Sequence, residues 1–514
     1  MNKQLIIVYH RQPYTEVREP DGTVTYVENK SPNGIVPTLK SFFAHVEKGA
    51  WVAWRAVVPG SDETWERRIT FEDSHGSYEV VRLPLRPEQV RRFYHETSKE
   101  AFWPILHSFP WHCNVDGADW DTFVEVNQRF ADGAIEIADD DALIWVHDYN
   151  LWLVPGMIRK QRPNARIAFF HHTPFPAADI FNILPWRTQI IDSLLACDLV
   201  GFHIPRYAAN FAGVARSLRD VDITTEEVPD SLRPVGAPLF ERETPTKLTL
   251  DGHDCWIDAC PVGTNPLLID SLLAEETAER TLQRLYAELG DQRLIVSIGR
   301  VDYVKGTTQL LEAFERLLER RPDLHGKLKL CVTSVMAAAG MQVYDDAKAQ
   351  IEGLVGRING RFSNLAWTPV LLFTNALPFD EVIAYYRMAH ICWVTPLRDG
   401  LNLVAKEYVA AHRNRGGVLV LSEFTGVAVE LPEAVMTNPY SDKSMDEAIE
   451  QALAMPDDEQ RRRMAAMYER VVEHDIGHWA EHCFQAFDNL DRRGVAKPAP
   501  APGPVVEVTP PAEA

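Results

Sequence analysis

Short apolar runs that are rich in β-branched residues alternate with longer amphipathic segments over most of the chain. This alternation is typical of parallel sheets covered by helices. The apolar runs predict strands at residues 5–9, 51–54, 143–146, 167–170, 199–203, 294–298, 328–333, 370–373, 391–395 and 418–421. The amphipathic segments predict helices at residues 152–161, 309–320, 345–357, 380–389 and 444–455. The pattern therefore predicts an α/β protein with doubly wound sheets.

The pattern also divides the chain near residue 265. A strand-like stretch ends in the turn sequence 260–266, and one long helical pattern, about 267–289, follows it. We therefore expect two Rossmann-like domains, residues 1–265 and 266–469, that face a central cleft. The last helical region is about 457–490, and its end, about 470–490, is expected to pack back on the first domain. Residues 496–514 are rich in Pro and Ala and are expected to form a disordered tail.

Composition narrows the function. The chain has 514 residues, of which 46% are hydrophobic and 24% charged, and this excludes disordered, collagenous and coiled-coil classes. Its formal net charge is −21, which leaves no general basic surface for nucleic acid, so a phosphorylated ligand must be held by a few placed cations. The seven cysteines include no C-x-x-C pair, and no apolar stretch approaches the ~18 residues of a membrane span. We expect a cytoplasmic protein.

Arg300 and Lys305 follow a predicted strand and precede a predicted helix. In an open α/β sheet, ligands bind beyond the carboxyl ends of the strands, so both side chains would overhang the cleft. Two cations suit a diphosphate because they offset the charge that grows on a departing phosphate. The alternative is a solvated loop, and from this spacing alone it is the stronger interpretation.

The segment 393–408 has the same order of strand, loop and helix. Gly400 lets the backbone approach a ligand closely. The helix would open with three amides that favour phosphate, those of Asn402, Leu403 and Val404. Glu407 lies one turn further, about 6 Å along the axis, where its carboxylate either binds a ribose diol or pairs with a surface cation. Asp399 suits sugar hydroxyls, and Arg398 is equally an ion-pair partner.

The N-terminal half carries polar residues where apolar strands end. His147 and Asp148 follow one predicted strand, and His171 and His172 follow the next. Buried polarity at these positions is costly unless it binds something. The spacing matches no common metal-ligand motif, so we favour sugar binding over a metal site.

The N-terminal tip contains Arg11 and a loop with Gly34 that leads into a helix, which together form a candidate phosphate cradle. The loop is neither a Walker A motif nor G-x-G-x-x-G, which weighs against kinases and dinucleotide oxidoreductases. Tyr94 and Trp103 either line a polyol pocket or belong to the core.

Six blocks, in order, resemble the trehalose-6-phosphate synthase family of retaining GT-B glycosyltransferases: 147–149, 169–176, 300–306, 356–360, 395–407 and 438–440. The resemblance covers about residues 4–490 and implies a GT-B fold. It also implies that Arg300 and Lys305 bind the donor diphosphate, that Glu407 binds the donor ribose, and that Asp399 and His172 bind the transferred glucose. The acceptor-side positions that it implies are Arg11, the Gly34 amide, Tyr94, Trp103 and Asp148.

Two departures from the family pattern concern the acceptor. The family's Gly-Gly loop is replaced by residues 31–37, and the second-domain Arg that contacts the phosphate of glucose 6-phosphate is replaced by the stretch 336–342. Segments 9–14, 31–34 and 98–110 resemble the members of the family that move glucose from ADP-glucose to glycerol 3-phosphate in compatible-solute synthesis. The alternatives are trehalose 6-phosphate synthesis, a pseudo-glycosyltransferase that uses a cyclitol nucleotide, and a silent regulatory subunit, which would have lost the donor motifs.

The resemblance leads to a front-face mechanism that needs no metal or other cofactor. Asp148 orients the acceptor hydroxyl, His172 contacts the glucose, and Arg300 and Lys305 stabilise the leaving diphosphate. The sequence does not determine which nucleotide base the donor carries. It is compatible with a homo-oligomer without predicting one.

Overall fold

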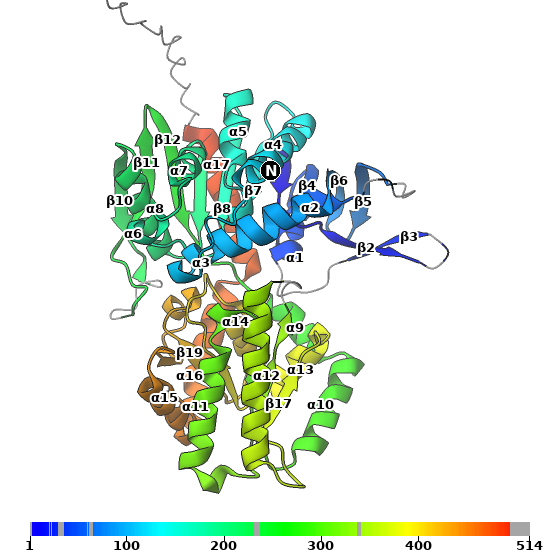
Figure 1. The fold of residues 1–514 in the computed structure, drawn as a ribbon, viewed down its shortest axis with the longest axis vertical. Helices are drawn as coiled ribbons and strands as arrows, with labels where there is room; N and C mark the ends of the chain where they lie inside the picture. The colour runs from blue at the N-terminus through cyan, green and yellow to red at the C-terminus, as the bar shows by residue number, and fades with distance from the viewer. Residues whose placement is uncertain are drawn as a thin grey trace, which may run out of the picture.

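The computed structural model of the protein describes residues 3–19, 21, 23–28, 35–58, 60, 65–230, 237–336 and 341–493. Two large sheets, each with helices on its faces, lie one above the other along the longest axis (Figure 1). The prediction of an α/β fold is confirmed. Gly34, the stretch 337–340 and the tail 496–514 lie outside the described residues, so the expectations for them stay predictions.

The first sheet has ten strands in the order β10-β11-β12-β9-β8-β7-β1-β4-β6-β5. Its central strands are parallel, whereas β5 is antiparallel to β6 and β10 to β12 form antiparallel pairs at the other edge. The sequence pattern predicts the parallel centre but not these edges, whose strands are only partly buried. The bounds are β1 Gln4–Val8, β4 Lys48–Ala56, β5 Arg68–Asp73, β6 Gly76–Leu85, β7 Leu143–His147, β8 Arg166–His171, β9 Leu199–Phe202, β10 Asp222–Glu227, β11 Glu243–Leu250 and β12 His253–Ala259.

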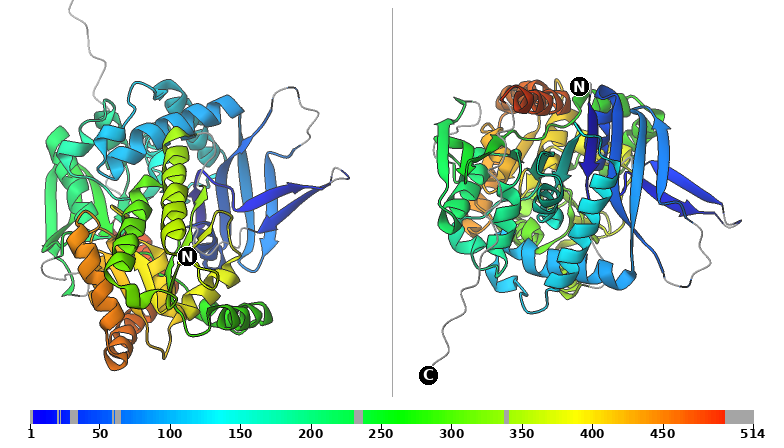
Figure 2. Two further views of the ribbon diagram at one scale, coloured as in Figure 1. Left: turned by 60° about the horizontal axis from the view of Figure 1, so that its bottom comes forward. Right: turned by 90° about the horizontal axis from the view of Figure 1, so that it is seen from above.

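The second sheet is parallel throughout, in the order β17-β15-β13-β18-β19-β20. Its strands are β13 Arg293–Ser297, β15 Leu328–Thr333, β17 Val370–Phe373, β18 Ile391–Val394, β19 Val418–Ser422 and β20 Val435–Thr437. β13, β18 and β19 read as continuous apolar runs because helices cover both faces of the sheet. Two small pairs complete the strands: β14 Arg300–Val301 with β16 Val335–Met336, and a hairpin of β2 Tyr14–Arg18 with β3 Val24–Glu28 that projects beside β5 (Figure 2).

Each large sheet and its helices form one body: the first body contains the ten-stranded sheet and the second body contains the six-stranded sheet. The first body contains α1 Ile35–Lys40, α2 Pro87–Val90, the π-helix η2 Arg91–Phe102, α3 Trp103–Leu106, α4 Trp120–Ile137, α5 Val154–Gln161, α6 Ala178–Phe181, α7 Arg187–Leu195 and α8 Pro205–Leu218. The second contains α9 Pro266–Leu273, α10 Glu276–Leu289, α11 Thr307–Arg320, α12 Gln342–Phe362, α13 Phe379–Met388, α14 Leu403–Ala411, α15 Asp442–Ala454 and α16 Asp457–Glu473. The chain continues into α17 Ile476–Arg493.

The single helix predicted at about 267–289 is wrong, because α9 and α10 are separate helices. The Ala274 amide closes α9 on the Ser271 carbonyl, and Glu275 is extended. α9 packs mainly against α14 and to a smaller extent against α13, whereas α10 packs mainly against α13. Tertiary packing therefore overrides a helical pattern that runs through the break.

The helix α17 runs from the second body along the back of the first (Figure 1). Its Trp479 lies 5.7 Å from Trp145 of β7 between ring centroids, and Arg166 donates a hydrogen bond to the Phe487 carbonyl at 3.4 Å. The turn before α17 is bonded to the end of the first half, since the Ile476 amide donates a hydrogen bond to the Thr264 carbonyl at 2.8 Å. The domain boundary at residue 265 stays a prediction. Because α17 packs on the first sheet, residues from both halves of the chain contribute to one hydrophobic core.

All seven cysteines are free thiols, and six of them are buried. In the part of the chain that the structure describes, every helix is too short or too polar to cross a membrane.

Candidate active site

The two bodies meet where the predicted site residues follow their strands. Asp148 and His172 come directly after β7 and β8, and Gly400 lies in the loop after β18. A Cβ atom on Gly400 would lie 2.7 Å from the His172 carbonyl oxygen, which is closer than any side chain permits. The Tyr207 hydroxyl of the first body also donates to the Asp399 carbonyl at 2.9 Å. Gly400 is therefore needed for the close contact of the two bodies, in addition to any contact with a ligand.

Asp148 combines a strained backbone with a buried carboxylate. Its φ of 70° is rare for a residue other than glycine and is characteristic of functional sites. One carboxylate oxygen, Oδ1, is buried without a hydrogen-bond partner among the described residues. Burial raises the pKa of Asp148 from 3.8 to about 6, although hydrogen bonds from the Tyr149 and His172 amides and the charge of Lys99 oppose the shift. The side chain is thus an unsatisfied acceptor, suited to a substrate hydroxyl.

The histidines beside Asp148 are held neutral. His147 Nδ1 and His172 Nε2 lie 3.1 Å apart, so one ring donates an N–H to the other. Burial holds the pKa of both rings well below its usual range. The His171 ring instead lies against the Thr173 carbonyl at 3.0 Å. Within the described ranges, no group of three or more His, Cys, Asp or Glu side chains is arranged to hold a metal ion.

The loop after β18 contains a network of charged and polar groups. Lys305 Nζ lies 2.7 Å from Asp399 Oδ2, and Asn402 donates to the same oxygen at 3.1 Å. Burial alone would raise the pKa of Asp399, but Lys305 lowers it overall, so the carboxylate is ionised. Asn402 has a φ of 87°, and its side chain accepts the Ala405 amide to cap α14. The amides of the first turn have no partners within the helix and remain the predicted phosphate contacts.

Glu407 is only 1% exposed, which rules out the interpretation of a surface residue paired with a cation. The Tyr386 hydroxyl donates to its Oε2 at 3.5 Å, and burial holds its pKa well above the usual range. Arg398 lies over the Phe424 ring, 5.4 Å from its centroid, and has no ion pair among the described residues. The ribose role of Glu407 stays a prediction.

Tyr94, one of the predicted acceptor residues, lies on a cationic side of the site. Burial raises the pKa of Tyr94, but the charges of Lys99, Arg11 and Arg300 outweigh it and lower the pKa overall. Trp103 is buried, and its indole N–H lies 3.5 Å from Asp302 Oδ1. The charge of Arg300, a predicted donor residue, therefore reaches Tyr94, a predicted acceptor residue.

Three residues of this region escaped the sequence analysis. Lys99 and Asp302 are buried beside Trp103, and both ring nitrogens of the buried His10 lack partners within the described part of the chain. Asp302 stands inside the block 300–306, and His10 adjoins Arg11, so their positions in sequence were available signals. Lys99 stands between Ser98 and Glu100 in a polar stretch, so nothing in its sequence neighbours sets it apart.

Comparison with known proteins decides the family. The model of glycosyltransferase family 20 matches residues 3–489. The chain belongs to glycosyltransferase family 20. This family 20 protein is 56% identical over 94% of its length to the glucosylglycerol-phosphate synthase of Synechocystis sp., of which it covers 97%. It is 35% identical to a trehalose-6-phosphate synthase of Mycobacterium sp., over 97% of each chain.

Solved structures agree with this assignment. The α,α-trehalose-phosphate synthase (UDP-forming) of Burkholderia xenovorans in complex with glucose-6-phosphate superposes with a TM-score of 0.81 at 28% identity, covering 95% of this chain and 100% of that one. The GT-B fold implied by the resemblance is confirmed, as is the prediction of a glycosyltransferase.

Proposed function

We propose that this family 20 enzyme transfers glucose, with retention, from ADP-glucose to glycerol 3-phosphate and releases glucosylglycerol phosphate and ADP. One observation carries the proposal: the buried Asp148 carboxylate keeps an unbonded oxygen next to the cationic region around Tyr94. A polyol phosphate offers a hydroxyl for the carboxylate and an anion for the cations. The name of the 56% identical relative supports glycerol as the polyol.

The acceptor phosphate would be bound from the first body by Arg11 and Tyr94, together with the Gly34 amide. The acceptor hydroxyl would then donate to Asp148 Oδ1 and attack the sugar carbon on the face from which the diphosphate leaves. The departing phosphate oxygen takes the hydroxyl proton, so no separate base is required. Asp148 orients the hydroxyl, and orientation of this kind is a large contribution to rate.

The donor would lie along the second body. Arg300, Lys305 and the first turn of α14 at Leu403 and Val404 offset the charge on the leaving diphosphate. Asp399, held by Lys305 and Asn402, would bind sugar hydroxyls, as would the neutral His172. Because fixed cations supply this stabilisation, we expect the enzyme to stay active when EDTA removes divalent metal ions from the assay.

A matrix of donors and acceptors tests the proposal, with released nucleoside diphosphate as the signal. We expect kcat/KM for glycerol 3-phosphate to be at least ~100-fold higher than for glucose 6-phosphate. A difference of this size is what the loss of one charged contact, that of the family's second-domain Arg, would cost glucose 6-phosphate. Free glycerol should be a poor acceptor, and Arg11→Ala should raise the KM for glycerol 3-phosphate far more than the KM for ADP-glucose. Equal or better use of glucose 6-phosphate would replace the proposal with trehalose 6-phosphate synthesis. Release of nucleoside diphosphate from none of the donors would favour a regulatory subunit.

A further inference from the structure

Lys99 is a buried cation that has no counter-ion among the residues that the structure describes. The residue is 9% exposed, and within the described residues its ammonium makes neither a hydrogen bond nor an ion pair. Its contacts are aromatic: the ammonium lies 3.7 Å from the centroid of the Trp103 ring, 5.7 Å from that of Tyr94 and 5.9 Å from that of Tyr149. Cation–π contacts offset only part of the cost of burying a charge. An anion that enters the site would supply the missing partner.

A π-helix brings Lys99 to this position. In an α-helix with 3.6 residues per turn, residues five or nine apart point to different sides, so Tyr94, Lys99 and Trp103 would not share a face. η2 has i→i+5 hydrogen bonding, and the Trp103 amide donates to the Ser98 carbonyl at its end. The hydroxyls of Thr97 and Ser98 donate to the carbonyls of residues 92 and 93, five positions earlier, which stabilises the wide turn.

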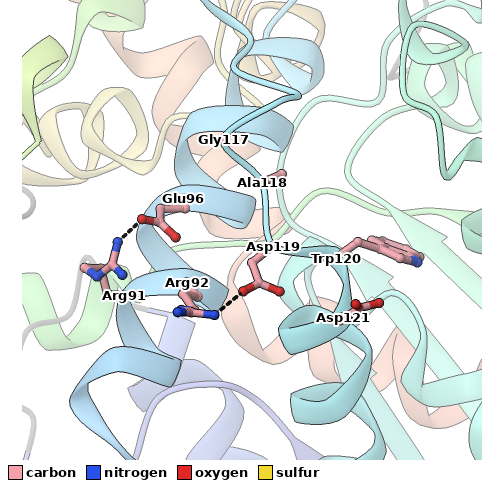
Figure 3. A pocket seen from close by; sticks show the side chains of 8 residues that line it. All are labelled: Arg91, Arg92, Glu96, Gly117, Ala118, Asp119, Trp120 and Asp121. Carbon is pink, nitrogen blue, oxygen red and sulfur yellow. Dashed lines mark hydrogen bonds and ion pairs between the residues drawn. The ribbon is translucent and has the colours of Figure 1, made fainter.

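The outer face of the same helix shows what ordinary cations do in this protein. Arg91 pairs with Glu96, and Arg92 pairs with Asp119 at 2.8 Å, around a polar surface hollow (Figure 3). On the inner face, the charges of Lys99, Arg11 and Arg300 all act on Tyr94. The buried Asp302 also acts on Lys99 but does not form an ion pair with it. Positive charge is therefore concentrated on the inner side, and no carboxylate of the described part of the chain forms an ion pair with Lys99.

We infer that Lys99 binds the phosphate of the acceptor, together with Arg11, and supplies the cation that the family's second-domain Arg provides elsewhere. The inference rests on the proposed function only for the identity of the acceptor. Any phosphate monoester that enters beside Tyr94 would meet the same ammonium. The burial that lowers the pKa of Lys99 also means that little water competes for it.

The test compares Lys99→Met, which removes the charge and keeps an unbranched side chain, with Lys99→Arg and with Arg91→Met on the outer face. For Lys99→Met we expect the KM for glycerol 3-phosphate, and the inhibition constant of inorganic phosphate, to rise ~30-fold or more, because a charged hydrogen bond is lost. The KM for ADP-glucose should change less than about threefold. Lys99→Arg should recover most of the affinity, and Arg91→Met should behave as the unmodified enzyme.

Thermal unfolding without ligand separates binding from a merely structural role. Removing a buried charge that lacks a partner should leave the Tm of Lys99→Met unchanged or higher, whereas loss of a structural contact would lower it. A threefold or smaller change in both acceptor constants, or an equal rise in the donor KM, overturns the inference even if glycerol 3-phosphate is the preferred acceptor. If glucose 6-phosphate is preferred but phosphate inhibition still depends on Lys99, the inference holds and the proposed function fails.

Discussion

Replacing Asp148 by Asn should make the protein more stable and the enzyme much less active. Burial raises the pKa of this carboxyl from 3.8 to about 6, so ionising it costs more in the folded protein than in the unfolded chain. At 1.36 kcal/mol per pKa step, the cost is about 3 kcal/mol at pH 7. Asparagine carries no charge, tolerates the φ of 70° and still accepts hydrogen bonds from the amides. The stability cost is therefore removed without a new backbone strain.

The sign of the pH dependence follows from the same pKa. The folded pKa is raised, so the cost is absent below pH 3.8, grows between pH 3.8 and 6, and is complete above pH 6. With an unfolding entropy of about 2 cal/mol/K per residue, 3 kcal/mol corresponds to a rise in Tm of about 3 °C at pH 7.5. At pH 5.0 the gap between the two proteins should be about half as large. His147 and His172 stay neutral through this range and do not contribute.

The assays are thermal unfolding of both ligand-free proteins at pH 7.5 and 5.0 and steady-state kinetics at pH 7.5. The kcat/KM for the acceptor should fall by ~10²-fold or more in the Asn variant, because the oriented hydroxyl loses its charged acceptor. The unmodified enzyme should also lose activity as the pH falls below about 6. An Asn variant that is less stable at pH 7.5, or a stability gap that is the same at both pH values, would refute the burial argument.

Two other substitutions test the donor side and the contact between the bodies. Arg300→Ala or Lys305→Ala should lower kcat by ~10²-fold or more, since each removes a cation that contacts the leaving diphosphate. Circular dichroism should show an intact fold. Full activity of both variants with ADP-glucose would contradict the donor assignment. Gly400→Ala should lower the free energy of unfolding by about 1–3 kcal/mol in denaturant titrations, because the new Cβ atom would overlap the His172 carbonyl. An unchanged unfolding midpoint would mean that the contact relaxes at no cost.

The strands that position the site were predictable because the centre of each sheet is buried on both faces. Every residue of β7 and β8 is buried, so an unbroken apolar run identifies each strand and places Asp148 and His172 at its end. The edge strands were not predictable in this way, since β5 and β10 face solvent and carry mixed residues. The break between α9 and α10 was missed because helical periodicity continues through it.

Charges were harder to place than strands. The spacing of Glu407 left burial and exposure equally open, and only the packing of Tyr386 beside it decides for burial. Lys99 was missed because even an α-helical repeat, with 3.6 residues per turn, would not place it on the same face as Tyr94. No local sequence pattern predicts a twelve-residue π-helix, because its hydrogen bonds depend on how η2 packs against its neighbours.

The return of α17 to the first sheet links the order of synthesis to the order of folding. Trp479 and Phe487, which cover Trp145 of β7, leave the ribosome more than 300 residues after it. At 5–20 residues per second, the second half takes roughly 10–50 s to be made, and for that time the middle of the first sheet has one uncovered aromatic face. The N-terminal half therefore cannot complete its own core as it emerges. Nascent chains of this protein are exposed to misassembly until α17 has been made, and a gene divided at residue 265 would make that exposure permanent.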